Sequence, residues 1–325
     1  HYPLRRQRQM CIRDRCNISQ STDAPTTLGF TKSHKVDVTT VNTTASGQQV
    51  IQLFYRIEGQ DLRNSGWNHL SSSSFLTLSF YFKTTKTGTS KLPIMFRTRH
   101  GTNYYYVKNV TVTDPTNWNR YTVTIPGNSN IQIDDAITTG MDINFTYYSG
   151  PDKDTSSEGS WGSTNAYSTS DSTNYFDSTS NDMFITGIQL EVGDTATSFE
   201  HRSYGEELTR CLRYFYQSSH WGTASGTGYA ALGVNYTGYQ TSNGNWIWVT
   251  CYLPVVMRAA PTLDTSDQVG NTGNKHSIFT STGGARTNNV TNYHTSPYND
   301  HFTVSNYNET KYGMQVSGVK ADAEL

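Results

Sequence analysis

The chain has 325 residues and a formal net charge of −1, and aromatic residues (13%) are almost as frequent as charged ones (16%). This length is sufficient for two domains that each have a hydrophobic core. A charge so close to zero offers no field to attract nucleic acid, and no apolar run approaches the roughly 20 residues that a membrane-spanning helix needs. We therefore expect neither nucleic-acid binding nor membrane insertion.

The first fifteen residues include the string RRQRQMCIRDR (residues 5–15). As protein, this string would form a basic arm suited to phosphate contacts. It looks, however, like one reading frame of the adapter used in transposase-based sequencing libraries. We interpret residues 1–15 as an adapter-derived artefact, and we expect the natural sequence to start near Cys16 and to lack an upstream portion.

Apolar and polar residues alternate in several segments that follow, as they do in strands with one buried face. The clearest segments are VIQLFYRI (50–57), FLTLSFYFKT (75–84), RYTVTIP (120–126), MDINFTYY (141–148) and MFITGIQLEV (183–192). Turn-rich links of the kind that join antiparallel strands separate them. We predict that residues 16–200 form an all-β, antiparallel jelly-roll β-sandwich, with a bulge at Gly187.

Residues 150–182 show no strand or helix periodicity and are rich in small polar side chains, which predicts a long loop. The loop contains Trp161, Tyr167 and Tyr175, interleaved with amides and carboxylates. Flat aromatic rings next to such polar groups suit the binding of sugars. These three residues are therefore candidate carbohydrate contacts, although the same rings would also serve to pin the loop to the sandwich.

Three further tyrosines are candidates for the same role. Tyr104 and Tyr106 share one face of the segment NYYYVKN (103–109), and Tyr148 lies opposite the apolar residues of its strand. Ordinary cross-strand packing is the alternative. The acidic residues Asp152, Asp154 and Glu158 suit a structural calcium ion or a solvated acidic loop, and we predict no other cofactor and no transition-metal site.

A helix signal interrupts the strand pattern after residue 200. Ser203 followed by Glu206 fits a capping box, and Leu208, Cys211, Leu212 and Phe215 follow at helical spacings. We predict a helix over about residues 204–214, within a linking segment of residues 201–216. Strand patterns return at 228–236, 245–257, 301–307 and 311–325, so residues 217–325 are predicted to form a second, smaller β domain.

The segment ITGIQLEVGDTATSFEHRSYGEELTRCLRYF (185–215) resembles a junction found in bacteriophage tail-fibre and related virion proteins. That junction reads roughly QLE.G..AT.FE.R....EL..C.RYY, and Phe215 here replaces its second tyrosine. Shorter pieces agree in order, among them YRIEGQDL (55–62), NWNRYTVTIPG (117–127) and PVVMRAAPT (254–262). The resemblance implies a carbohydrate-binding-module-like jelly roll, a short helix and a terminal β domain on a virion appendage that is commonly trimeric.

Motifs for catalysis are missing from the sequence: it contains no GxSxG, HExxH, Walker-type or dinucleotide-binding pattern. The acidic pairs Asp134–Asp135 and Glu206–Glu207 are adjacent in sequence, which does not place two carboxylates across a cleft. We therefore predict a protein without enzymatic activity or catalytic residues.

The predicted function is that of a virion tail component, a tail fibre or receptor-binding protein, which acts outside the cell. Its expected partners are a host cell-surface glycan, other virion tail proteins and two further copies in a homotrimer. Three alternatives stay open: an architectural virion subunit without glycan binding, a polysaccharide depolymerase, and an accessory module of a secreted enzyme.

Overall fold

The computed structural model describes residues 15–42, 47–218, 236–239, 245–266, 275–279, 285–289, 292–296, 298–308, 313–316 and 318–324. The chain divides into two compact units, His1–His201 and Arg202–Leu325. Residues 1–14 of the adapter-like segment and residues 228–235 of one predicted strand lie outside the described residues.

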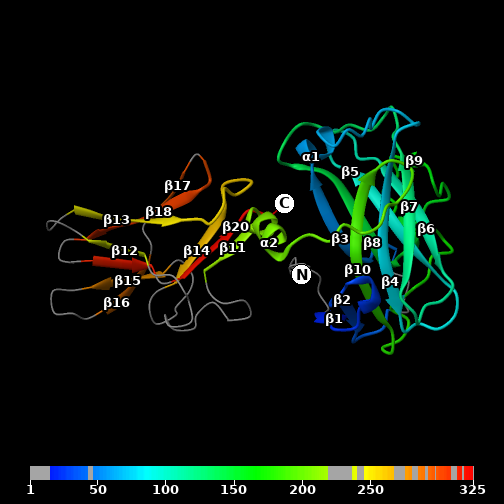
Figure 1. Cartoon of the computed structure of the whole chain (residues 1–325), viewed down its shortest axis with the longest axis horizontal. Coiled ribbons are helices and arrows are strands. Elements are labelled where there is room, and N and C mark those ends of the chain that lie inside the picture. Colours follow the sequence, from blue (N-terminus) through cyan, green and yellow to red (C-terminus); the bar gives the residue numbers. More distant parts are fainter. Residues whose placement is uncertain are drawn as a thin grey trace. The chain divides into compact units, whose positions relative to one another are not determined.

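The first unit is a sandwich of two five-stranded antiparallel sheets (Figure 1). The first sheet has, in spatial order, β1 (Cys16–Ser21), β2 (Ser33–Val38), β10 (Asp182–Val192), β4 (Phe75–Thr84) and β7 (Asn119–Pro126). The second sheet has β3 (Val50–Glu58), β8 (Thr139–Ser149), β5 (Ser90–Thr98), β6 (Tyr105–Val112) and β9 (Trp161–Gly162). The predicted all-β, jelly-roll-like class is confirmed.

The core of this unit lies between the two sheets. Side chains at alternate positions of β4 and β8 fill it, and they are at most 2% exposed: Leu76, Leu78, Phe80, Phe82, Met141, Ile143, Phe145 and Tyr147. Phe80 meets Phe145 edge to face, with ring centroids 5.0 Å apart. Strand alternation would place Tyr55 of β3 on the core side, yet 52% of this residue is exposed.

The β10 strand contains the predicted bulge. Its register against β4 shifts between Thr186 and Gln189, and Gly187 between them has a φ of +58°. A Cβ at Gly187 would lie 2.6 Å from Cζ of Phe30, so both the backbone conformation and the space demand glycine.

Short helical turns accompany the sheets. The first unit contains η1 (Thr26–Leu28), α1 (Gly59–Arg63) and η2 (Pro151–Lys153). The second unit begins with α2 (Tyr204–Leu212), where the Ser203 hydroxyl accepts the Glu206 backbone N–H at 3.3 Å. The predicted helix and its N-cap are confirmed, and no residue of α2 is fully buried.

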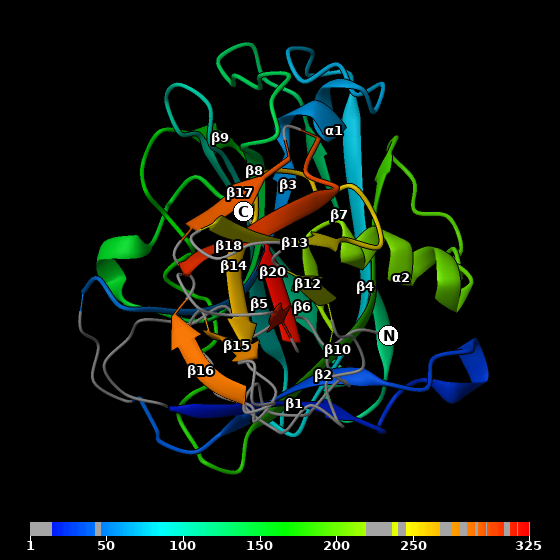
Figure 2. The ribbon, with the colours of Figure 1, turned by 90° about the vertical axis from the view of Figure 1, so that its left-hand side faces the viewer.

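In the described residues after α2, the strands form three small sheets. In spatial order, the first of these sheets has β11 (Phe215–Gln217), β20 (Gly318–Asp322) and β14 (Thr262–Ser266). The second has β12 (Tyr236–Tyr239), β19 (Gly313–Val316), β15 (Lys275–Phe279) and β16 (Ala285–Asn289). The third has β13 (Asn245–Tyr252), β18 (His301–Asn308) and β17 (Asn292–Thr295). The strands β13, β18 and β17 run side by side (Figure 2). Their buried side chains include Val249, Cys251, Phe302 and Val304, whereas Trp248 is 50% exposed.

Among the described helices, none is long and apolar enough to cross a membrane. Within the same part of the chain, no three His, Cys, Asp or Glu side chains gather closely enough to hold a metal ion. Of the acidic residues considered for calcium, Asp154 accepts the Ser168 hydroxyl and Glu158 pairs with Lys108 at 3.1 Å.

Candidate functional site

Three of the tyrosines predicted to contact sugar belong to the core: Tyr106, Tyr148 and Tyr175. Tyr148 is 5% exposed and lies opposite Ile51, where the register between β3 and β8 shifts. Tyr175 is fully buried, and its hydroxyl lies 2.9 Å from that of Ser90. Burial raises the pKa of Tyr175 well above its ordinary value. Tyr106 is 5% exposed and packs on Phe96 and Trp161. This corrects the prediction for all three residues, because large rings are more stable between the sheets than at the surface.

Trp161 and Tyr104 are half-buried and also pack against the core. The Trp161 indole donates a hydrogen bond to the Pro126 carbonyl at 2.7 Å, and its ring lies 5.4 Å from that of Tyr106. Through these contacts Trp161 fastens the long loop, residues 150–181, to the edge of the second sheet. This is the pinning role that the sequence left open for the loop aromatics.

The remaining candidate, Tyr167, lies near the outer face of the second sheet, which we define as its surface away from the core. Side chains alternate between the two faces of a strand. In β8 the core residues therefore alternate with Asp142, Asn144 and Thr146, which project to the outer face. The long loop folds over part of this face, where Ala166 and Tyr167 pack on Met95, Tyr105 and Val107.

The outer face carries a row of buried polar side chains that sequence reasoning missed. Asp142, Asn144 and Thr146 are at most 1% exposed. Within the described residues, Oδ1 of Asp142, Oδ1 of Asn144, Oγ1 of Thr146 and Oε1 of the neighbouring Gln52 have no hydrogen-bond partner. An unsatisfied buried acceptor costs about 1–3 kcal/mol, and native structures contain few of them. Four such acceptors therefore gather on this one face.

A cluster of arginines surrounds one end of this row. Oδ2 of Asp142 accepts hydrogen bonds from Nε (2.8 Å) and Nη2 of Arg97. The guanidinium Nε of Arg99 lies 3.6 Å from the same oxygen, and Nε of Arg56 lies 3.7 Å from Oδ1. Arg97 also donates a hydrogen bond to the Tyr167 hydroxyl at 3.1 Å. Burial lowers the pKa of Arg97, but the Asp142 carboxylate outweighs this effect, so that the pKa is raised overall.

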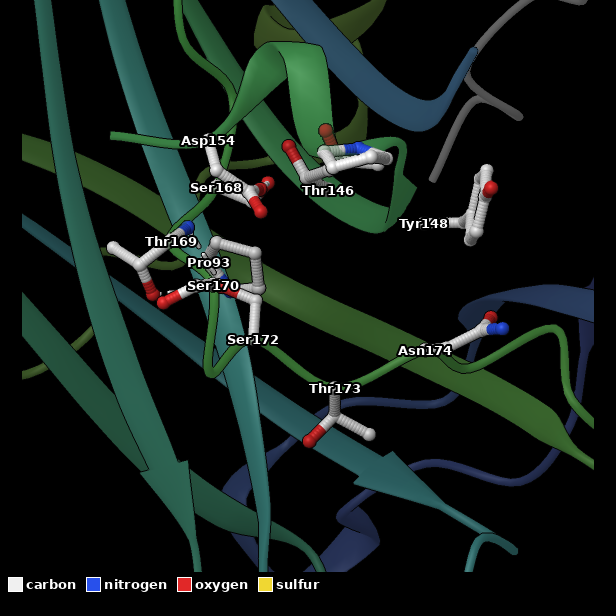
Figure 3. A pocket seen from close by; sticks show the side chains of 12 residues that line it. Pro93, Thr146, Tyr148, Asp154, Ser168, Thr169, Ser170, Ser172, Thr173 and Asn174 are labelled. Carbon is white, nitrogen blue, oxygen red and sulfur yellow. Dashed lines mark hydrogen bonds between the residues drawn. The ribbon is translucent and has the colours of Figure 1, made fainter. Parts of the chain in front are cut away.

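At the other end of the row lies a pocket of about 150 Å³ (Figure 3). The sheet contributes Pro93, Thr146 and Tyr148 to it. The long loop supplies a wall of hydroxyl and amide groups from Ser168, Thr169, Ser170, Ser172, Thr173 and Asn174.

Hydrogen bonds hold this wall in place. The Asn174 amide donates to the Asn42 carbonyl at 2.8 Å, and the Ser172 hydroxyl donates to the Asn109 side chain at 3.0 Å. The Thr173 hydroxyl accepts the backbone N–H of Lys91 at 2.8 Å. The wall is thus a fixed part of the sandwich.

The pocket is rich in hydroxyl groups and contains one carboxylate, that of Asp154. A cavity of about 150 Å³ accommodates a single six-membered ring such as benzene. Thr146 belongs both to the pocket and to the polar row, and its Oγ1 has no hydrogen-bond partner within the described residues. Asp142, four residues back along β8, is about 13 Å away at the rise of a strand.

No protein-family model matches the chain, and no curated protein matches it either. Among solved structures, the enzymatically active domain of tailspike protein 4 from bacteriophage CBA120 is 12% identical with a TM-score of 0.29. That match covers 55% of this chain and 18% of the tailspike chain, so the chain spans less than a fifth of the tailspike's length.

Two carbohydrate-binding structures are also similar. A family 11 carbohydrate-binding module from Clostridium thermocellum, in complex with a mixed-linked tetrasaccharide, is 12% identical, with 57% of this chain and 86% of that chain covered and a TM-score of 0.28. A tandem of family 22 modules from Paenibacillus barcinonensis is 8% identical, with 96% and 90% covered and a TM-score of 0.28.

Proposed function

We propose that the first unit is a carbohydrate-binding module whose site is the pocket together with the polar row on the outer face. The observation that carries this proposal is Thr146, a fully buried side chain that lines the pocket with an unpartnered Oγ1. Sugar hydroxyls are hydrogen-bond donors, and the Thr146 oxygen in the pocket wall would accept from one of them.

The apolar parts of the site fit the same ligand. Pro93 presents carbon surface beside the hydroxyl wall, and Tyr167 lies farther along the face. Sugar-binding sites combine such surfaces, which contact ring C–H groups, with a few well-placed polar groups.

We also propose that the protein binds the glycan without cleaving it. Hydrolysis needs two carboxylates that face each other across the bond, one of them able to give up a proton. The acidic residues of the site are engaged otherwise, because Asp142 is bonded by Arg97 and Asp154 accepts from Ser168.

The setting that we propose is a virion tail appendage, with other tail proteins as neighbours. The support is the junction motif at residues 185–215, which resembles that of tail-fibre proteins. In such a setting each site is weak, and a trimer would gain strength by engaging several glycans at once.

A glycan array probed with the full-length chain and with Thr146→Val tests the binding proposal. Valine keeps the shape of threonine and removes its oxygen, so we expect about tenfold weaker binding from the loss of about 1.4 kcal/mol. The matched control is Thr122→Val, an exposed threonine of β7 on the other sheet, which should bind like the wild type.

Each alternative makes a distinct prediction. Absence of binding to any glycan, with normal incorporation into particles, would favour an architectural subunit. Release of reducing ends from a bound polysaccharide would establish a depolymerase and overturn the proposal of binding without cleavage.

A further inference from the structure

We propose that the pocket holds a single uncharged sugar ring, and that Asp154 and Thr146 select this ring by accepting hydrogen bonds from its hydroxyl groups. This inference rests on the proposed glycan binding and names the class of sugar that the pocket takes. Sugars that carry a carboxylate or a sulfate are excluded from it.

The first support is the charge of the pocket. Among the described residues that line it, Asp154 alone has a charged side chain. The backbone N–H of Lys91 bonds to the wall residue Thr173, but the Lys91 ammonium group pairs with Asp171, which does not line the pocket. A carboxylate that shares a pocket with no cation repels a second anion. A sugar that carries a negative charge is therefore unfavourable in this pocket.

The second support is a pair of acceptor oxygens that two separate elements bring to the pocket. Thr146 comes from β8, and Asp154 directly follows η2 (Figure 3). Oδ1 of Asp154 accepts the Ser168 hydroxyl, whereas Oδ2 makes no hydrogen bond or ion pair within the described part of the chain. Oγ1 of Thr146 has no partner there either. A carboxylate oxygen can only accept, and a sugar hydroxyl can donate, so both oxygens suit an uncharged ring.

The third support is the fixed position of Asp154 in a pocket of limited size. Backbone hydrogen bonds hold the chain on both sides of this residue: the Tyr167 N–H donates to the Lys153 carbonyl at 2.7 Å, and the Thr155 N–H donates to the Ser168 carbonyl at 2.8 Å. A binding group that is already in place loses little entropy when the ligand arrives. Because the volume of about 150 Å³ accommodates one ring, the rest of a glycan lies outside the pocket.

The experiment titrates the full-length chain with glucose, galactose and mannose and with the three matching uronic acids, which carry a carboxylate in place of the C6 hydroxymethyl group. We expect at least one neutral sugar to bind, and its uronic acid to bind at least about tenfold more weakly. Asp154→Asn keeps the acceptor for Ser168 and removes the charge. This variant should bind the neutral sugar about fivefold more weakly, and its preference over the uronic acid should fall below about threefold.

The control is Asp177→Asn, which removes the same charge from the far end of the same loop, where Asp177 pairs with Lys86 outside the pocket. It should keep the preference of the wild type, and an equal change in both variants would overturn the inference. A uronic acid that binds the wild type as tightly as its neutral partner would also overturn it while glycan binding stands. The same holds if glycans on an array bind but none of these single sugars does. Binding to no single sugar and to no glycan on the array would overturn both proposals.

Discussion

Substitution of Asp142 by asparagine should destabilise the first unit more than any surface charge change does. The carboxylate is fully buried, and Arg97, which bonds to it, keeps only 15% of its side chain exposed. Asparagine keeps the size of aspartate and removes the charge, which takes away the carboxylate that Arg97 bonds.

The expected loss is about 3 kcal/mol, the lower end of the range for breaking a buried ion pair, because Arg56 and Arg99 can turn toward water. For a unit of this size, each kcal/mol of lost stability lowers the melting temperature by about 2–4 °C. We therefore expect the melting temperature to decrease by about 6–12 °C. In a double-mutant cycle with Arg97→Gln, the coupling energy should reach at least about 1 kcal/mol.

Thermal and urea unfolding of the full-length chain measure these quantities. The matched control is Lys86→Met. Lys86 pairs with Asp177 at 2.6 Å, and the Asp177 side chain is 43% exposed, so this ion pair lies at the surface. Such a pair contributes at most about 1 kcal/mol. A decrease of less than about 2 °C for Asp142→Asn, or a coupling energy near zero, would refute the idea that the cluster is a buried ionic network.

Other substitutions test the architecture around the site. Gly187→Ala should cost more than about 2 kcal/mol in urea unfolding, because φ is +58° and Cβ would approach Phe30; a loss below about 1 kcal/mol would contradict this. Burial lowers the pKa of His34 to about 4 from 6.5, so the unfolded chain binds the extra proton between these pH values. Stability should therefore fall by up to about 3 kcal/mol from pH 7 to pH 4, and His34→Gln, followed in parallel, should lack this component. Trp161→Ala should speed proteolysis of the long loop and weaken glycan binding together; an unchanged cleavage rate would show that the ring does not pin the loop.

The sequence predicted the sandwich because its strands are amphipathic in a regular way. In β4 and β8 the period of two is unbroken over the core residues, so local pattern and tertiary burial agree. The N-cap at Ser203 was predictable for a similar reason, since the hydrogen bond to Glu206 spans only three residues. The bulge at Gly187 followed from a glycine inside a strand pattern.

The site was much less predictable, because it depends on contacts between distant residues. The polar positions Asp142, Asn144 and Thr146 have the alternation of a solvated strand face, and only the folded structure reveals that they are buried. Arg97 reaches Asp142 across 45 positions of sequence, which no periodicity encodes.

The error for Tyr175 has a related origin. The loop around it is polar, which favours exposure, yet this ring turns inward and packs on Phe82 and Tyr147. Composition averages over a segment, whereas a single aromatic side chain can fold into the core independently of its neighbours.

In the long loop, the residues that anchor it to the sandwich differ from the residues that line the pocket. Trp161 and Tyr175 anchor it in the core, while the residues between them supply much of the pocket wall. Changes at wall positions such as Ser170 and Thr173 would alter which ligand fits and leave the anchors intact. The anchored loop is therefore a segment in which the proposed recognition can diversify without a loss of folding stability.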